Sequence, residues 1–229
     1  MSFSEILKQM WDAFVKFYIG RGLLWTGIGY TLLLSAIAVF FGTLLGSLMA
    51  IGKRSKFKPL VILITAVVEV LRGTPALLQL YVAYFLVPMM LKIRGMNPMI
   101  SVAVAMSLNS AAYVSEIIRS GIEAVDKGQT EASRALGLTG KTTMIKIVLP
   151  QAVKNILPAL GNEFITVIKE TSLAATFYVG DLMTTYNIIN GVTHQTLPIL
   201  FDIAIFYFVM TFSLSKLLGV FERRMKKRA

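Results

Sequence analysis

Five long apolar segments constrain the fold of this chain more than any other feature of its sequence. A helix that crosses a lipid bilayer needs about 20 predominantly apolar residues. Five segments reach this length, at about residues 23–51, 59–91, 98–122, 152–179 and 197–220. Only 15% of the residues are charged, whereas ordinary soluble domains carry about 25%. The sequence therefore predicts an all-α membrane protein with five transmembrane helices.

The composition excludes several kinds of chemistry. The chain has no Cys, so disulfides, thiolate metal sites and cysteine nucleophiles are excluded. Its one His, His194, falls in a short loop before the last apolar segment, where we expect a solvated or interfacial side chain and no metal ligand. A membrane enzyme would need convergent acid, base or metal groups, and the His and Cys counts argue against it.

The N-terminal 22 residues have a different pattern. Apolar side chains recur there at helical spacing, with polar side chains between them. The apolar positions are Phe3, Ile6, Leu7, Met10, Trp11, Phe14 and Tyr18. This pattern predicts an amphipathic helix in the membrane interface over residues 1–22, followed by a transmembrane domain over residues 23–229.

The positions of the 23 Lys and Arg residues predict the orientation. Sixteen of them fall in the loop at 53–58, in the stretch at 119–154 and in the C-terminal segment at 216–228. Cytoplasmic loops are enriched in these residues, so we expect a cytoplasmic C-terminus and an N-terminus outside. The formal charge of +11 is then an orientation signal, and no nucleic-acid partner is needed.

Small residues occupy every fourth position of the first span. They are Ala38, Gly42, Gly46 and Ala50. Such a stripe lets another helix backbone approach closely. It predicts either packing within this chain, which we favour, or a contact between two chains.

The longest segment between spans, residues 126–150, lies on the predicted cytoplasmic side. Glu131 to Leu136 suits a short helix that Gly137 ends, and Thr139 suits the cap of a second short helix. A structured loop of this length on a small membrane protein is usually functional. It can present a rigid surface to a soluble partner.

The spacing Glu131-Ala132, Gly137, then Ile147-x-Leu149-Pro150 resembles the signature loop of permease subunits in bacterial ABC-type importers. In that family the segment forms a coupling helix that seats in a groove of a cytoplasmic ATPase. The resemblance implies coupling roles for six residues, of which Ser133 stands where the family usually has Ala. These six are Glu131, Ala132, Ser133, Gly137, Leu138 and Pro150.

Three further stretches, residues 69–75, 109–119 and 157–173, are similar to permeases of the polar amino acid uptake group. The resemblance implies a subunit in the bacterial cytoplasmic (inner) membrane that carries a polar amino acid, with a basic one as an option. Its implied partners are a second permease subunit, identical or homologous, cytoplasmic ATPase subunits and an extracytoplasmic binding protein. ATP and Mg would be bound by the ATPase, so this chain needs no cofactor.

A near match to a nucleotide-binding loop occurs at residues 135–142, which end in Gly140-Lys141-Thr142. A P-loop follows a strand and opens a helix, so that backbone N–H groups cradle phosphate. The residues before this match suit a helix. We therefore expect the ATPase to be a separate polypeptide.

Polar residues within the spans indicate where a solute could bind. Glu69–Arg72 and Glu116–Arg119 are spaced to pair along one helix face, and Pro75 should weaken the helix in the middle of its span. Glu163 has no basic residue three or four positions away, and it falls near the bilayer midplane, as does Asn109.

A carboxylate at that depth suits a cationic group, either an α-ammonium or a basic side chain. Our hypothesis is that Glu163 and Asn109 line an amino acid site, with Thr74, Ser110 and Gln79 as further candidates. The alternative is that Glu163 bonds a neighbouring subunit. Three other acidic residues, Glu170, Asp181 and Asp202, are expected near the outer side, either solvated or in contact with the binding protein.

One rival function remains open, a self-contained secondary transporter or channel for small polar solutes. It predicts transport without an ATPase and an inverted repeat within the chain. Five spans show no convincing repeat, and the segment at 126–150 would have no purpose.

Overall fold

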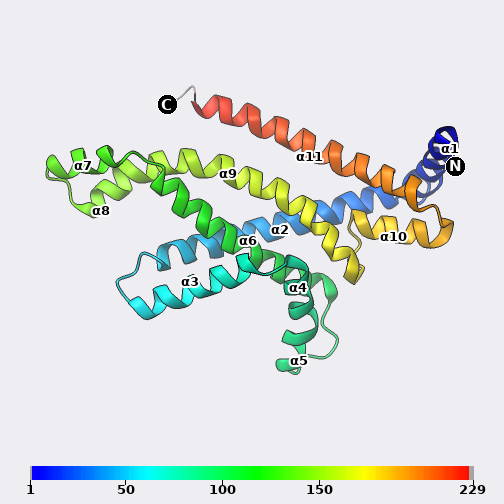
Figure 1. Ribbon diagram of the computed structural model, residues 1–229, viewed down its shortest axis with the longest axis horizontal. Coiled ribbons are helices and arrows are strands. Elements are labelled where there is room, and N and C mark those ends of the chain that lie inside the picture. Colours follow the sequence, from blue (N-terminus) through cyan, green and yellow to red (C-terminus); the bar gives the residue numbers. More distant parts are fainter. Residues whose placement is uncertain (1, 227–229) are drawn as a thin grey trace.

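The computed structural model describes residues 2–226, which form helices and the turns between them (Figure 1). The α-helices are α1 (Phe3–Ala13), α2 (Leu23–Gly52), α3 (Lys58–Gly73), α4 (Ala76–Tyr81), α5 (Val87–Met90), α6 (Pro98–Glu123), α7 (Lys127–Ala135), α8 (Gly140–Thr143), α9 (Leu149–Glu170), α10 (Leu182–Thr193) and α11 (Thr196–Lys226). Three π-helical segments, at Phe14–Ile19, Val82–Leu86 and Met144–Val148, and a 3₁₀ segment at Thr171–Phe177 extend these helices. Lys227 and Arg228, which contribute to the predicted orientation, lie outside the described residues.

Three of the described helices, α2, α6 and α11, are long and apolar enough to cross a membrane. They coincide with the first, third and fifth predicted spans. The pair α3 and α4–α5 passes the same test together, which raises the number to four. Helix α9 is less apolar than these helices because it contains Lys154, Glu163 and Lys169. The fifth transmembrane helix therefore stays a prediction.

The prediction of one helix over residues 59–91, the second predicted span, is wrong. The chain bends by 111° between α3 and the segment Ala76–Met90. Pro75 cannot continue the hydrogen bonding of α3 and disfavours a helical conformation at Thr74, whose backbone is extended. Figure 1 shows α4 and α5 leaving the direction of α3 as a separate limb.

The fourth predicted span, residues 152–179, also needs correction at both ends. Helix α9 begins at Leu149 and ends at Glu170, and the chain continues as the 3₁₀ segment Thr171–Phe177. Tyr178 then takes a left-handed conformation, with φ of 51°, which ends the run.

The small-residue stripe of α2 packs against α6 within the same chain. All four of its residues are buried. A Cβ added to Gly42 would lie 2.7 Å from the Ser110 Cβ, and one added to Gly46 would lie 2.6 Å from the Ala111 carbonyl oxygen. Two helices can approach this closely only because these positions have no side chain. The prediction of internal packing is confirmed.

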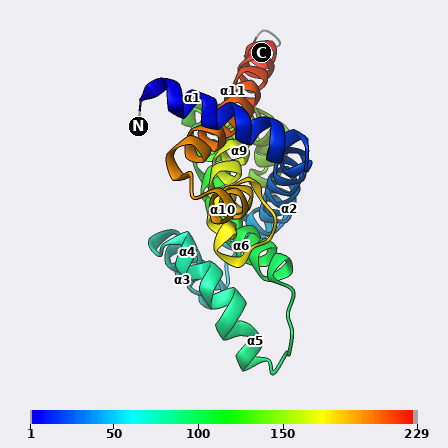
Figure 2. The same cartoon turned by 90° about the vertical axis from the view of Figure 1, so that its right-hand side faces the viewer.

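Helix α6 occupies the centre of the molecule, between α2, α3 and α9 (Figures 1 and 2). A core cluster joins α2, α6 and α9 through Leu34, Val102 and Val167. A second cluster, Val125, Val148, Ala152 and Ile156, fastens the C-terminal end of α6 to the start of α9. The polar residues of α6 are therefore held between three neighbouring helices.

The N-terminal segment is helical, as predicted, but its second half is part of the bundle. Ala13, Phe17 and Tyr18 are buried against Leu182 of α10 and Ile199 of α11. The first half keeps apolar side chains exposed, among them Phe3 and Trp11. The sequence gives no packing partner for this helix, because its partners come from the other end of the chain. Figure 2 shows α1 lying across the end of the bundle beside α11 and α10.

Candidate functional site

The break between α3 and α4 creates a polar cluster. Because Pro75 ends α3, backbone carbonyls at its C-terminus lose their helical partners. The Gln79 amide nitrogen donates to the Leu71 carbonyl at 2.7 Å, to the Thr74 carbonyl at 3.2 Å and to Thr74 Oγ1 at 2.9 Å. Thr74 Oγ1 also donates to the Val70 carbonyl at 2.7 Å. Gln79 therefore stabilises the bend and fixes the position of Thr74.

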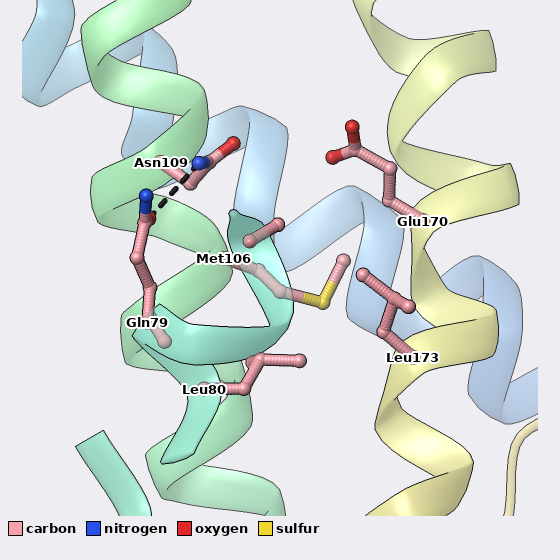
Figure 3. A pocket seen from close by; sticks show the side chains of 8 residues that line it. Gln79, Leu80, Met106, Asn109, Glu170 and Leu173 are labelled. Atoms are coloured by element: carbon pink, nitrogen blue, oxygen red, sulfur yellow. Dashed lines mark hydrogen bonds between the residues drawn. The ribbon is translucent and has the colours of Figure 1, made fainter. Parts of the chain in front are cut away.

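Asn109 of α6 extends this cluster. Its Nδ2 donates to Gln79 Oε1 at 2.9 Å, and its side chain is buried. Figure 3 shows Gln79 and Asn109 on one side of a small cavity, with Glu170 of α9 on the other side. The residues that line the cavity are Ala76, Gln79, Leu80, Ala105, Met106, Asn109, Glu170 and Leu173.

This cavity is closed. Its volume of about 10 Å³ holds about one water molecule, so an amino acid does not fit in this conformation. Met106, Leu80 and Leu173 fill the space below the polar groups (Figure 3).

The other two predicted residues form a separate pair beside the cavity. Ser110 Oγ donates to Glu163 Oε1 at 2.9 Å, and both side chains are buried. Neither residue lines the cavity. The five candidates thus form two groups, Thr74–Gln79–Asn109 and Ser110–Glu163. Adjacent residues of α6, Asn109 and Ser110, join the two groups.

Sequence reasoning missed Glu170 as a member of this site. It lines the cavity together with Asn109 and Gln79, although the sequence suggested a position near the outer surface. The available signal was its spacing, since Glu170 lies seven residues, about two helical turns, after Glu163. Two carboxylates therefore share one face of α9.

The predicted ion pairs are partly wrong. Glu116 pairs with Arg119 at 2.9 Å, as expected. It also accepts from Lys53 of α2 at 2.7 Å and lies 3.6 Å from Arg72 of α3. Arg72 therefore turns toward α6, and Glu69 has no ion pair among residues 2–226. The negative charge of Glu116 thus meets three positive charges from three helices, which compensates it better than Arg119 alone would.

Two of the three acidic residues expected to be solvated or in contact with the binding protein are buried. Asp181 caps α10, where its side chain accepts from the Met183 backbone N–H at 2.9 Å and from the Thr184 hydroxyl. Burial raises the pKa of Asp181, and these hydrogen bonds act in the opposite direction. Asp202 lies under α1, and its side chain is 6% exposed.

The segment at 126–150 has the two predicted short helices. Asp126 caps α7 by accepting from the Gly128 N–H at 2.6 Å, and Thr139 caps α8. Gly137 follows α7 with φ of 81°, a left-handed conformation that favours Gly. Arg134 Nη1 donates to the Leu138 carbonyl at 2.8 Å and closes the turn.

Most of the predicted coupling residues are accessible on this segment. Glu131, Ala132, Gly137 and Pro150 are exposed, and Leu138 is half-buried. Ser133 is different, because its side chain is buried and its Oγ donates to the Gln129 carbonyl at 2.6 Å. A small residue fits there because α7 packs on the segment Met144–Val148. Leu136, which is 82% exposed, is the prominent apolar side chain of this surface.

Residues 42–227 match the model of a protein family described as the binding-protein-dependent transport system inner membrane component. This match covers most of the chain. The chain belongs to this family. The resemblance inferred from the loop at 126–150 and from the three polar stretches is therefore confirmed, and the chain is an inner membrane component of a transport system that depends on a binding protein.

Curated relatives agree with this assignment along nearly the whole chain. A putative glutamine transport system permease of Rickettsia felis is 38% identical over 216 residues, which cover 94% of this chain and 99% of the relative. The arginine transport system permease of Bacillus subtilis is 38% identical over 200 residues, which cover 87% of this chain and 91% of the relative.

A solved structure supports the same fold. The crystal structure of an amino acid ABC transporter with histidines contains a chain that superposes with a TM-score of 0.87 at 42% identity. The match covers 92% of this chain and 98% of that chain. The fold of this chain is thus found in a solved transporter.

Proposed function

We propose that this chain is the membrane-spanning permease subunit of an ATP-driven amino acid importer. The family assignment carries the proposal, because the family consists of membrane components of systems that depend on a binding protein. Relatives named for glutamine and arginine transport, and a solved amino acid transporter, support an amino acid as the solute.

The solute binds between α6 and α9. Asn109 and Gln79 supply amide groups from one side of the cavity, and Glu170 supplies a carboxylate from the other. Glu163, which lies beside the cavity against Ser110, adds a second carboxylate when the site opens. A carboxylate in a desolvated site binds an ammonium or guanidinium group through charge-assisted hydrogen bonds. Two carboxylates on one helix face favour an amino acid that carries two cationic groups, the α-ammonium and a basic side chain. A neutral polar amino acid uses only one of them.

The bend at Thr74–Pro75 allows this site to open. Gln79 joins the end of α3 to α6, so the limb α4–α5 and α6 form one wall of the cavity. Helix α9 forms the other wall. Moving α9 outward separates Glu170 from Asn109 and makes room for the solute. This alternation between a closed and an open site is the conformational change that the importer needs.

The exposed face of α7 docks the ATPase. Leu136 and its neighbours Glu131 and Ala132 form the contact, and Ser133 supports the segment from inside. ATP and Mg bind to that partner, and this chain performs no covalent chemistry. We infer that the docked surface faces the cytoplasm, and with five spans the C-terminus would then be inside and the N-terminus outside. A second permease subunit, identical or homologous, completes the pathway, and the binding protein delivers the solute from outside.

The E163Q variant tests the site. In the reconstituted complex with its ATPase and binding protein, we expect uptake of a basic amino acid to need about 10- to 100-fold more solute for half saturation. This range corresponds to the loss of one hydrogen bond to a charged group. The matched control is E123Q, because Glu123 is an exposed carboxylate near the end of α6.

Unchanged uptake and unchanged solute-stimulated ATPase activity in E163Q would remove Glu163 from the site and leave it as a contact to a neighbouring subunit. A separate measurement tests the function itself. Proteoliposomes that contain only this chain should not concentrate amino acids. Vigorous accumulation by the chain alone would identify a self-contained transporter or channel instead.

A further inference from the structure

A groove between α1 and α11 contains a buried carboxylate that the transport site does not use. The groove has a volume of about 310 Å³ and lies at the end of the bundle where α1 crosses α11 (Figure 2). Its lining residues are Leu7, Met10, Trp11, Phe14, Asp202, Ile205 and Phe206. Asp202 is the single charged residue in this set.

The Asp202 side chain lacks a partner within the described chain. Its Oδ2 is fully buried and has no hydrogen bond, and none of the ion pairs among residues 2–226 includes it. The adjoining Tyr18 hydroxyl is also buried and without a hydrogen bond. An uncompensated charge in a protein interior or a bilayer is costly, so a carboxylate at this position either takes up a proton or binds a cation.

Aromatic rings surround the same position. The Phe14 and Phe206 centroids lie 6.3 Å apart, and Tyr18 meets Phe206 edge to face at 5.1 Å. Trp11 stacks on Phe14 at 6.0 Å and is 65% exposed at the groove. Aromatic faces attract organic ammonium groups, and a carboxylate next to them adds a charged hydrogen-bond acceptor.

The chemistry of the walls decides between possible cations. A divalent metal needs six or more oxygen ligands or several carboxylates, and the groove supplies one carboxylate. A free amino acid also brings its own carboxylate, for which the lining residues offer no basic partner. An ammonium group attached to an apolar body fits both the carboxylate and the apolar walls.

The surroundings of the groove indicate which kind of molecule supplies this ammonium group and its apolar part. Leu7 of α1 and Ile205 of α11 line the groove and are exposed, so they give it an apolar outer rim. Phe3, Phe201 and Phe208 are further exposed apolar side chains of the same two helices. In a membrane this rim faces acyl chains. We propose that the groove binds a phospholipid with a primary amine headgroup, whose ammonium donates to Asp202 while its acyl chains cover the rim.

Brominated lipids test this proposal, because Trp11 lies in the groove and the chain has only two Trp residues. The full-length W25F variant in lipid nanodiscs leaves Trp11 as the sole Trp fluorophore. Dibrominated phosphatidylethanolamine and dibrominated phosphatidylcholine are then compared in a background of unbrominated phosphatidylcholine. The choline headgroup has no N–H, so it cannot donate a hydrogen bond to Asp202.

We expect half-maximal quenching of Trp11 at about tenfold less brominated phosphatidylethanolamine, a preference equal to about 1.4 kcal/mol. The D202N variant should lose this preference, and D12N, which changes an exposed carboxylate of α1, should keep it. In a W11F chain the remaining Trp25, which is 72% exposed on α2, should be quenched equally by both lipids.

Equal quenching of Trp11 by the two lipids would overturn the proposal. The comparison in the W25F chain needs no substitution in the groove, so it remains decisive if D202N does not fold. F206L provides a second, uncharged perturbation: both lipids should quench Trp11 less effectively, because the lost aromatic face attracts both headgroup cations, while the preference for phosphatidylethanolamine remains. Unchanged half-maximal quenching by both lipids in F206L would contradict the aromatic part of the site.

Discussion

The contact between α2 and α6 can be tested with two glycines of α2. Gly46 is packed against α6, whereas Gly29 faces open space. In the G46A variant, the new Cβ lies 2.6 Å from the Ala111 carbonyl oxygen and 2.8 Å from the Val114 Cβ. The first of these atoms belongs to the backbone of α6 and cannot rotate away. The helices must separate by several tenths of an ångström, and overpacking of this kind costs about 1–3 kcal/mol.

The matched control is G29A on the same helix. Nothing lies within 4 Å of a Cβ at Gly29, and its backbone is helical and exposed. Replacing Gly by Ala inside a helix stabilises it by about 1 kcal/mol. Both variants add the same methyl group and gain the same helix propensity, so they should differ in unfolding free energy by the overpacking cost alone, about 1–3 kcal/mol.

Thermal unfolding in detergent, followed by Trp fluorescence, measures the difference. For a chain of this size about 2–4 °C of melting temperature corresponds to 1 kcal/mol, so G46A should melt roughly 2–12 °C below G29A. Equal melting temperatures would show that α2 does not lie against α6 at this position. The close approach, and with it the position of Asn109 and Ser110, would then be wrong.

Two further variants test the charge cluster and the coupling segment. In E116Q, three cations lose a carboxylate that is 17% exposed, and we expect destabilisation by about 1–3 kcal/mol, seen as a lower melting temperature that high salt partly restores. An unchanged melting temperature would contradict the role of Glu116 in joining α2, α3 and α6. In G137A, the left-handed backbone with φ of 81° is strained by about 1–2 kcal/mol, and transport-coupled ATPase activity should fall while the bundle stays folded. The control is G140A, which also has open space but no positive φ, and an equal effect of both substitutions would refute the argument.

Local chemistry explains which features could be predicted from the sequence. The runs that form α2, α6 and α11 are long and apolar, and the stripe containing Gly42 and Gly46 has one physical use, a close helix contact. Caps are equally local, so Gly137 and Thr139 indicated where the short cytoplasmic helices end and begin. These features depend on residues within a few turns of each other.

Features that depend on distant residues were not predictable in the same way. The sequence placed a break at Pro75, but the bend of 111° depends on how Gln79 bridges α3 and α6. Arg72 has a carboxylate three residues away, yet it turns to Glu116, where Lys53 and Arg119 also meet. The burial of Asp202 requires α1 to fold back from the opposite end of the chain.

The two candidate sites lie on one continuous helical segment. Residues 140–170, from α8 through Met144–Val148 to α9, form helix without a break. Leu149 marks the start of α9, and Glu163 lies fourteen residues further, about 21 Å along the axis. The cluster of Val125, Val148, Ala152 and Ile156 packs the end of α6 against this segment. We therefore expect a force on α8 to move Glu163 and Glu170 relative to Asn109, because a helix transmits displacement along its length while the contact with α2 holds α6 in place.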